Sequence, residues 1–175
     1  MNEQKKIKFI FPPLVNGIQV YESEQLFPVG KIYCVGGNYE DHAKEMGGVV
    51  DRDQPFFFSK PPQSINQSNQ ITFPTQTNDL QHEVELVVLL GSKCSNVEVD
   101  KAHEHIFGYA VGVDLTKRDL QKIAKDSGKP WDLSKGFDNS APISSVLKFE
   151  KKVLREGRIE LALNGVIKQS SNVSN

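Results

Sequence analysis

Residues 82–90, with the sequence HEVELVVLL, carry the strongest β-strand pattern in the chain and constrain its fold most. Side chains alternate across a strand, so Glu83 and Glu85 share one face, which Val87 and Leu89 continue. The opposite face, which we expect to point toward the core, carries Val84, Leu86, Val88 and Leu90. The two carboxylates are therefore expected at the polar end of a strand that is otherwise buried on both sides.

A second strand, predicted at Ile106–Leu115, places a third acid in a similar position. Alternation puts Asp114 on one face with Ala110 and Gly112, small residues that leave room beside the strand. Two glutamates two residues apart would raise each other's pKa unless a cation held them. Three carboxylates without a cysteine ligand suit a hard cation such as Mg²⁺ or Mn²⁺. The spacing alone fits acids that face solvent at strand ends equally well.

A short helix is predicted over Tyr39–Met46, between a cap at Asn38 and the glycine pair that follows. His42 and Glu45 are three residues apart and share a side of this helix. A carboxylate beside an imidazole fixes its orientation and stabilises its charged form, as a general base requires. On spacing alone, an exposed surface pair is the simpler interpretation.

The other strand signals are short and bounded by turn residues. Asn164-Gly165, between Ile159–Leu163 and Val166–Gln169, is the dipeptide most typical of a tight β-hairpin. Further strands are predicted at Lys31–Val35, at Phe56–Ser59, which we expect to be buried, and at Ile71–Phe73.

Helical signals are few. Val97–His105 favours a short helix, and another is predicted from Thr116 to about Ser127, where Thr116 and Asp119 resemble a capping box. Gln63–Gln70 is predicted to be a surface loop. Because strands and long helices do not alternate, the pattern argues against a doubly wound sheet and predicts a β-rich α+β domain with packed sheets.

The bulk properties exclude several classes of partner. The 175 residues suit one domain, and 21 Lys and Arg against 22 Asp and Glu provide no field for nucleic acid or an anionic membrane. The polar N-terminus lacks a signal-peptide pattern, and the longest apolar run is too short to span a bilayer. Two cysteines, Cys34 and Cys94, are expected as free thiols. We predict a soluble, cytoplasmic protein.

Several motifs in the chain, in this order and spacing from about residue 30 to 170, together resemble the fumarylacetoacetate hydrolase family. The likeness is to its small branch of acylpyruvate hydrolases, oxaloacetate decarboxylases and related hydratase/isomerases. The motifs are CVGGNY at 34–39, Asp41-His42, Lys44-Glu45-Met46, PFFFSKP at 55–61, HEVEL at 82–86, GYAVGVDLTKRD at 108–119, Pro130-Trp131 and SKGFDNSAP at 134–142.

The resemblance implies a mixed β-sandwich or roll over residues 31–175, preceded by a lead-in over residues 1–30. Members of the family that resemble this chain continue for several dozen residues after the position of Asn175, with a Thr-Gly-Thr-Pro loop that closes the substrate pocket. We therefore expect the C-terminal part of the domain to be absent from this sequence. Gly37 stands where some members carry arginine, so a substrate-carboxylate contact is expected to be missing there.

The resemblance also implies roles for particular residues. Glu83, Glu85 and Asp114 match metal ligands for Mg²⁺ or Mn²⁺, and His42 and Glu45 match a pair that activates water. Lys135, in the motif SKGFD, matches a lysine beside the metal and the substrate.

The implied reaction is Mg²⁺-dependent hydrolysis of acylpyruvates, decarboxylation of oxaloacetate, or both, on a small 2-oxo acid bound by a homodimer. Two alternatives stay open at this point. One is a hydratase or isomerase of unsaturated 2-oxo diacids, and the other is a truncated metal-binding relative without turnover.

Overall fold

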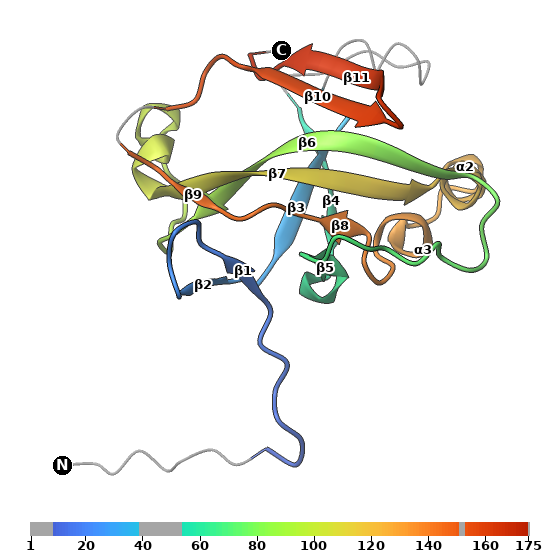
Figure 1. Ribbon diagram of the computed structural model, residues 1–175, viewed down its shortest axis with the longest axis horizontal. Coiled ribbons are helices and arrows are strands. Elements are labelled where there is room, and N and C mark those ends of the chain that lie inside the picture. The colour runs from blue at the N-terminus through green and yellow to red at the C-terminus, as the bar shows by residue number, and fades with distance from the viewer. Residues whose placement is uncertain (1–8, 39–53, 151–152, 175) are drawn as a thin grey trace.

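Two long antiparallel strands, β6 (Leu80–Leu90) and β7 (Ile106–Lys117), cross the centre of the computed structural model (Figure 1). The structure describes residues 9–38, 54–150 and 153–174. Both predicted strands are confirmed, each two residues longer than predicted, and the 3-10 helix η2 (Val99–His105) lies where a short helix was expected. Their register sets Glu83 opposite Asp114, which brings two of the predicted acids together.

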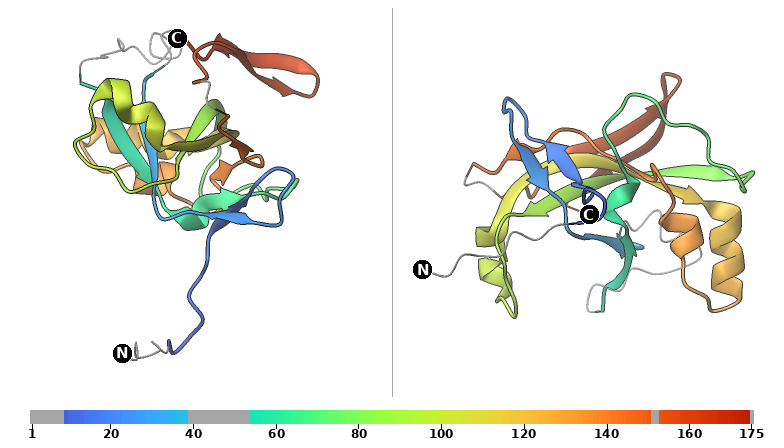
Figure 2. Two further views of the ribbon diagram at one scale, coloured as in Figure 1. Left: turned by 90° about the vertical axis from the view of Figure 1, so that its left-hand side faces the viewer. Right: turned by 90° about the horizontal axis from the view of Figure 1, so that it is seen from below.

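The remaining strands form small sheets around this pair, as the two further views show (Figure 2). In the described part of the chain they pair as β1 (Gly17–Gln19) with β2 (Leu26–Pro28), β3 (Ile32–Gly36) with β4 (Phe56–Lys60), β5 (Ile65–Asn66) with β8 (Ala141–Pro142), β9 (Leu147–Lys148) with β7, and β10 (Arg158–Leu163) with β11 (Val166–Asn172). The helices are short: η1 (Pro62–Ser64), α2 (Arg118–Asp126) and α3 (Asp132–Lys135). The predicted β-rich α+β class is confirmed.

The apolar core lies on the same side of β6 as the two glutamates. Leu89, which shares their face, is buried with Ile18, Ala110 and Val146. Gly108 permits this packing, because a Cβ there would lie 2.3 Å from the carbonyl oxygen of Leu147 on β9. The core therefore forms where β1 and Val146, directly before β9, pack against the face of β6 and β7 that also carries the acids.

The prediction that the opposite face of β6 points toward the core is wrong over the second half of the strand. Val88 is 46% exposed and Leu90 is 55% exposed. Val84 is buried, and its backbone N–H donates to the side-chain oxygen of Gln169 on β11 at 2.9 Å. Alternation separates the two faces correctly, but it does not tell which face the rest of the chain covers.

Some local predictions are corrected by tertiary contacts. The strand at β4 is present, but Phe56 and Phe57 are about half exposed rather than buried. The segment 71–73 is not a strand, and the predicted loop at residues 63–70 contains part of η1 and β5. Apolar composition predicted these strands, whereas their burial and pairing depend on neighbours distant in sequence.

The capping box predicted at Thr116 is also wrong. β7 continues to Lys117 and α2 begins at Arg118 without a side-chain cap. The Thr116 hydroxyl instead accepts a hydrogen bond from Lys135 Nζ, and the Asp119 carboxylate accepts one from Thr77 Oγ1 at 2.7 Å. Both side chains that fit a local cap are used for tertiary contacts.

The hairpin β10–β11 is confirmed. Asn164 and Gly165 both have positive φ values, 52° and 78°, as a two-residue type I′ turn requires. Leu163 pairs with Val166 across this turn.

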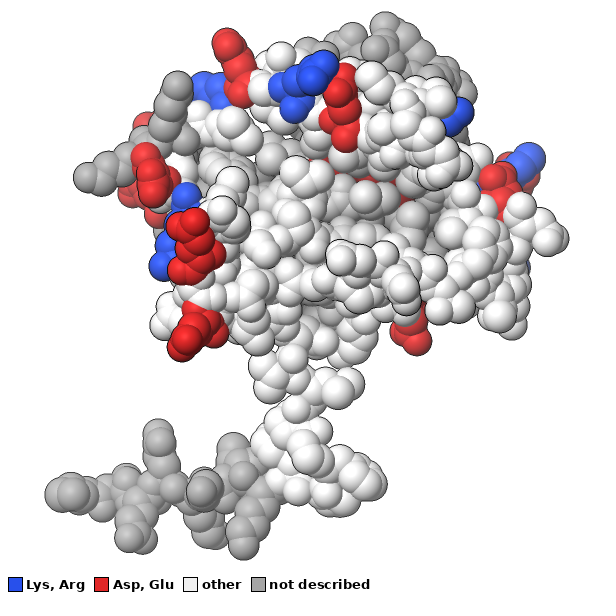
Figure 3. All heavy atoms as spheres, viewed as in Figure 1, with Lys and Arg blue, Asp and Glu red and all other residues white. Residues whose placement is uncertain are grey.

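Residues 17–28, within the predicted lead-in, form the hairpin β1–β2 and contribute Ile18 and Val20 to the buried interior. On the face shown in Figure 3, acidic and basic side chains lie mostly around the rim rather than in a continuous basic patch. None of the helices in the described ranges has the length and apolar content to cross a bilayer.

Candidate metal centre

The acidic side chains of the candidate centre come from adjacent positions of β6 and β7. Glu83 lies opposite Asp114 in the register, and Glu85 lies opposite Gly112 on the same face. The Asp114 side chain is 7% exposed and that of Glu83 is 12% exposed. Burial, together with the negative charges of Asp114 and Glu83, raises the pKa of Glu85 to about 8. The three predicted ligands are thus electrostatically coupled.

Lys135 bridges the two strands from the end of α3. Its Nζ donates to Glu83 Oε2 at 2.9 Å, to Asp114 Oδ2 at 2.7 Å and to Thr116 Oγ1 at 2.6 Å. The ammonium has three N–H donors, and these contacts use all of them. The side chain is 2% exposed, so the lysine predicted from the resemblance lies at the bottom of the acidic cluster rather than on the surface.

The placement of α3 explains why Lys135 points inward. Trp131, directly before the helix, packs against Phe56 and Phe58 of β4, with ring centroids 5.0 and 5.6 Å apart. The N–H of Lys135 donates to the Trp131 carbonyl at 2.9 Å, which ties the lysine to this aromatic anchor. Lys135 Nζ also lies 5.0 Å from the centroid of the Phe58 ring.

Lys60 is a second buried lysine of the cluster, and it was not among the predicted site residues. Its Nζ lies 2.9 Å from Asp114 Oδ1 and donates to the carbonyl oxygens of Leu115, at 3.2 Å, and of Lys135. Burial lowers the pKa of Lys60 from its ordinary value, and the Asp114 carboxylate opposes this effect. Lys60 thereby connects the end of β4 to both β7 and α3.

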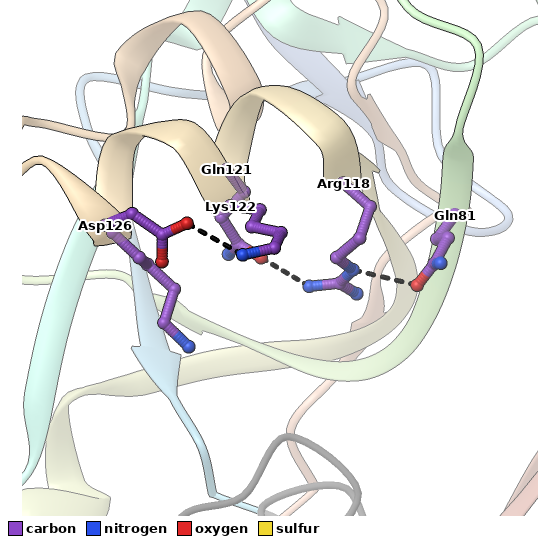
Figure 4. Close-up of a pocket in the computed structure, with 6 residues that line it drawn as sticks. Gln81, Arg118, Gln121, Lys122 and Asp126 are labelled. Carbon is purple, nitrogen blue, oxygen red and sulfur yellow. Dashed lines mark hydrogen bonds and ion pairs between the residues drawn. The ribbon is translucent and has the colours of Figure 1, made fainter.

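Arg118, the first residue of α2, holds the other oxygen of Glu83. Its Nη2 forms an ion pair with Glu83 Oε1, while its Nε donates to Gln81 at 2.8 Å and its Nη1 donates to Gln121 at 2.5 Å. The same arginine lines a hollow of about 330 Å³. Figure 4 shows its guanidinium between Gln81 and Gln121 at this hollow, which Lys122, Lys125 and Asp126 also line.

Cys34 of β3 lies near this cluster without taking part in its ion pairs. Burial, reinforced by the negative charge of Asp114, raises the pKa of the Cys34 thiol to about 12. The thiol is therefore neutral near pH 7, and since the thiolate is the reactive form, the predicted free thiol here is unreactive. Cys94, the other free cysteine, is exposed.

The donor set fits a hard divalent cation. All three side chains offer carboxylate oxygens, which Mg²⁺ and Mn²⁺ prefer. Within the described residues, Asp114 Oδ1 is buried without a hydrogen bond of normal geometry, and Glu85 carries a raised pKa that a nearby cation would reverse. The same described residues hold no three acidic, histidine or cysteine side chains already at the spacing of a metal site. Ammonium and guanidinium groups neutralise the acids instead.

His42 and Glu45 lie outside the residues that the structure describes, so their predicted roles stay predictions.

Of the residues that sequence reasoning missed, Lys60 stands within a motif of the resemblance, at the end of the phenylalanine-rich strand. Arg118 stands in another, four residues after Asp114. Charged residues that close a strand or begin a helix are usually solvated, so their burial shows only in the folded chain.

Comparison with protein-family models assigns the chain to a family. The family model described as fumarylacetoacetate (FAA) hydrolase C-terminal matches residues 31–175. The chain belongs to the fumarylacetoacetate hydrolase family. The strand-rich α+β fold with β6, β7 and the acidic cluster is accordingly the family's catalytic-domain fold, as the motifs predicted.

Other members of the fumarylacetoacetate hydrolase family show how much of the domain is matched. Fumarylpyruvate hydrolase from Ralstonia sp is 41% identical over 131 residues, which are 73% of this chain and 68% of the relative. The mitochondrial oxaloacetate decarboxylase of Dictyostelium discoideum is 38% identical over 147 residues, 82% of this chain and 67% of the relative. The chain thus spans about two thirds of the length of these curated relatives.

A solved structure of a family member also matches the fold of this chain. Fumarylpyruvate hydrolase from Pseudomonas aeruginosa, in complex with Mn²⁺ and pyruvate, superposes with a TM-score of 0.89 at 37% identity. The match covers 94% of this chain and 74% of that chain.

Proposed function

We propose that this chain is a divalent-metal-dependent enzyme that breaks the C3–C4 bond of small 2-oxo acids. Its reactions are hydrolysis of acylpyruvates, decarboxylation of oxaloacetate, or both. The observation that carries the proposal is the cross-strand pair of Glu83 and Asp114, with Glu85 beside it, in a buried cluster that also holds three basic side chains. Relatives named as a hydrolase and a decarboxylase, and a relative bound to Mn²⁺ and pyruvate, support it.

Glu83, Glu85 and Asp114 would hold Mg²⁺ or Mn²⁺, which supplies a Lewis acid for the carboxylate and 2-oxo oxygens of the substrate. The chain's own residues prepare this centre. Arg118 orients Glu83, and Lys60 orients Asp114, through the ion pairs already described. Lys135 provides a positive charge that offsets the negative charge the 2-oxo group gains as the bond breaks.

Turnover with and without metal tests the proposal. We expect pyruvate to be released from acetylpyruvate or oxaloacetate in the presence of Mg²⁺ or Mn²⁺, measured with a coupled lactate dehydrogenase assay. Chelation with EDTA should abolish turnover and added Mg²⁺ should restore it. Conversion of an unsaturated 2-oxo diacid without C–C cleavage would instead indicate the hydratase or isomerase alternative. No turnover of either 2-oxo acid by the metal-loaded protein would reject the proposal.

The predicted water-activating pair separates the two reactions. Hydrolysis needs water to attack the 4-carbonyl, whereas loss of carbon dioxide from oxaloacetate does not. We therefore expect His42→Ala to lower kcat for acetylpyruvate by about 10²–10⁴-fold, as for loss of a general base, and to lower decarboxylation much less. The exposed His103 provides a matched control, His103→Ala, that should leave both reactions unchanged. Equal losses in the two reactions would contradict a role for His42 in activating water.

A further inference from the structure

The oxygen atoms of the two opposed carboxylates are each engaged by a basic side chain. Glu83 contacts Arg118 through Oε1 and Lys135 through Oε2. Asp114 contacts Lys135 through Oδ2 and Lys60 through Oδ1. Glu85 lies beside these two acids on the same face of the strand pair.

Lys135 differs from the other two basic residues because it joins both carboxylates. Its Nζ lies within 2.9 Å of an oxygen of Glu83 and within 2.7 Å of an oxygen of Asp114, and its third donor is held by Thr116. Lys60 and Arg118 each contact only one of the two acids through the ion pairs described above. The Lys135 ammonium thus has the position of a cation shared between two opposed ligands.

We propose that Lys135 is an internal counter-ion that competes with the divalent cation for Glu83 and Asp114. This rests on the proposed function, which assigns the metal to the same acids. In the metal-free protein the ammonium holds the two carboxylates together against their mutual repulsion. A divalent cation close to these oxygens repels the ammonium, so metal binding displaces Nζ from at least one of them. The displaced ammonium then becomes available to the negative charge of the substrate.

This competition makes an uncommon prediction about metal affinity. Removal of a residue that merely supports a metal site weakens binding of the metal, typically by 10–100-fold. Removal of a competing cation strengthens it. We therefore expect Lys135→Met to bind Mn²⁺ about tenfold or more tightly than the natural protein does, even where turnover is lost. Lys135→Arg, which keeps the charge, should show no such gain.

The experiment is titration of the protein with Mn²⁺ alone, without substrate, with the free ion followed by electron paramagnetic resonance. Lys101→Met, at an exposed position of η2, removes the same charge far from any contact with the acids and should leave the Kd unchanged. Folding of each variant is checked by gel filtration and circular dichroism. Should Lys135→Met not fold, Lys135→Gln, which keeps hydrogen-bond donors without the charge, is titrated in its place.

Thermal melting gives a second readout. Without the Lys135 ammonium, Glu83 and Asp114 repel each other more strongly. Metal-free Lys135→Met should therefore melt at a lower temperature than the natural protein, and Mn²⁺ should raise its melting temperature by more. A Kd in Lys135→Met that equals or exceeds that of the natural protein would overturn the competition while leaving the metal centre in place. If no variant binds Mn²⁺, the proposed function fails together with it.

Discussion

Replacement of Glu83 by alanine is expected to abolish metal-dependent turnover of acetylpyruvate and oxaloacetate. Loss of a residue that only contacts a metal ligand lowers activity by up to about 10²-fold, so loss of a proposed ligand should lower it further. Glu83 is the acid that contacts both Arg118 and Lys135, and it lies opposite Asp114. Its removal takes away a proposed ligand. It also leaves Arg118 without its ion-pair partner and Lys135 with Asp114 alone, and these cations repel an incoming divalent ion.

The measurement is initial rate against Mg²⁺ concentration for both substrates, together with Mn²⁺ binding without substrate. Glu83→Gln keeps the shape of the side chain and should lose turnover as well, because an amide does not supply the negative charge. Glu104→Ala, at an exposed glutamate of η2, is the matched control and should behave as the natural protein does. Turnover that is unchanged in Glu83→Ala, or that needs no metal, would reject the assignment of this acid.

The Lys60→Met substitution is expected to cost about 3–5 kcal/mol of unfolding free energy, the cost of breaking a buried ion pair by removing one partner. Methionine fills a similar volume without charge. Asp114 Oδ1 would then be left buried without a counter-ion, and the carbonyl oxygens of Leu115 and Lys135 would lose a donor. The loss would therefore reach β7 and α3 together.

Urea unfolding followed by circular dichroism measures this effect. The double variant Lys60→Met/Asp114→Asn removes the unpaired charge and should recover part of the lost stability, which a double-mutant cycle quantifies. Lys31→Met, at an exposed lysine directly before β3, the strand paired with β4, should change stability by less than about 0.5 kcal/mol. A similarly small effect for Lys60→Met would show that the ion pair with Asp114 does not hold the centre together.

Features that depend on short stretches of chain could be predicted well. The hairpin β10–β11 follows from one dipeptide, because Asn164 and Gly165 tolerate the positive φ values of a type I′ turn. The presence of β6 and β7 follows from runs of β-prone residues, although each strand is two residues longer than those runs. The family was predictable as well, because a set of motifs in order is more specific than any single motif.

Features that depend on distant segments could not be predicted in the same way. Thr116 fits a helix cap in the sequence, yet its hydroxyl is held by Lys135 from another element. Lys60 looks like a solvated residue at a strand end, but it is 3% exposed. In both cases tertiary hydrogen bonds outweigh the local structural preference of the residue. A buried ammonium needs oxygen acceptors from several directions, and these come from distant parts of the chain.

In the candidate centre, local sequence is enough to predict which side chains share a face of a strand. Side chains alternate along any single strand. Glu83 and Glu85 therefore share a face of β6, and Asp114 and Gly112 share a face of β7. That these faces meet could be learned only from the folded chain. Register depends on the pairing of β6 with β7, and the placement of Lys135 depends on the packing of Trp131 against β4. These long-range contacts bring three separate acids and their basic partners into one buried cluster.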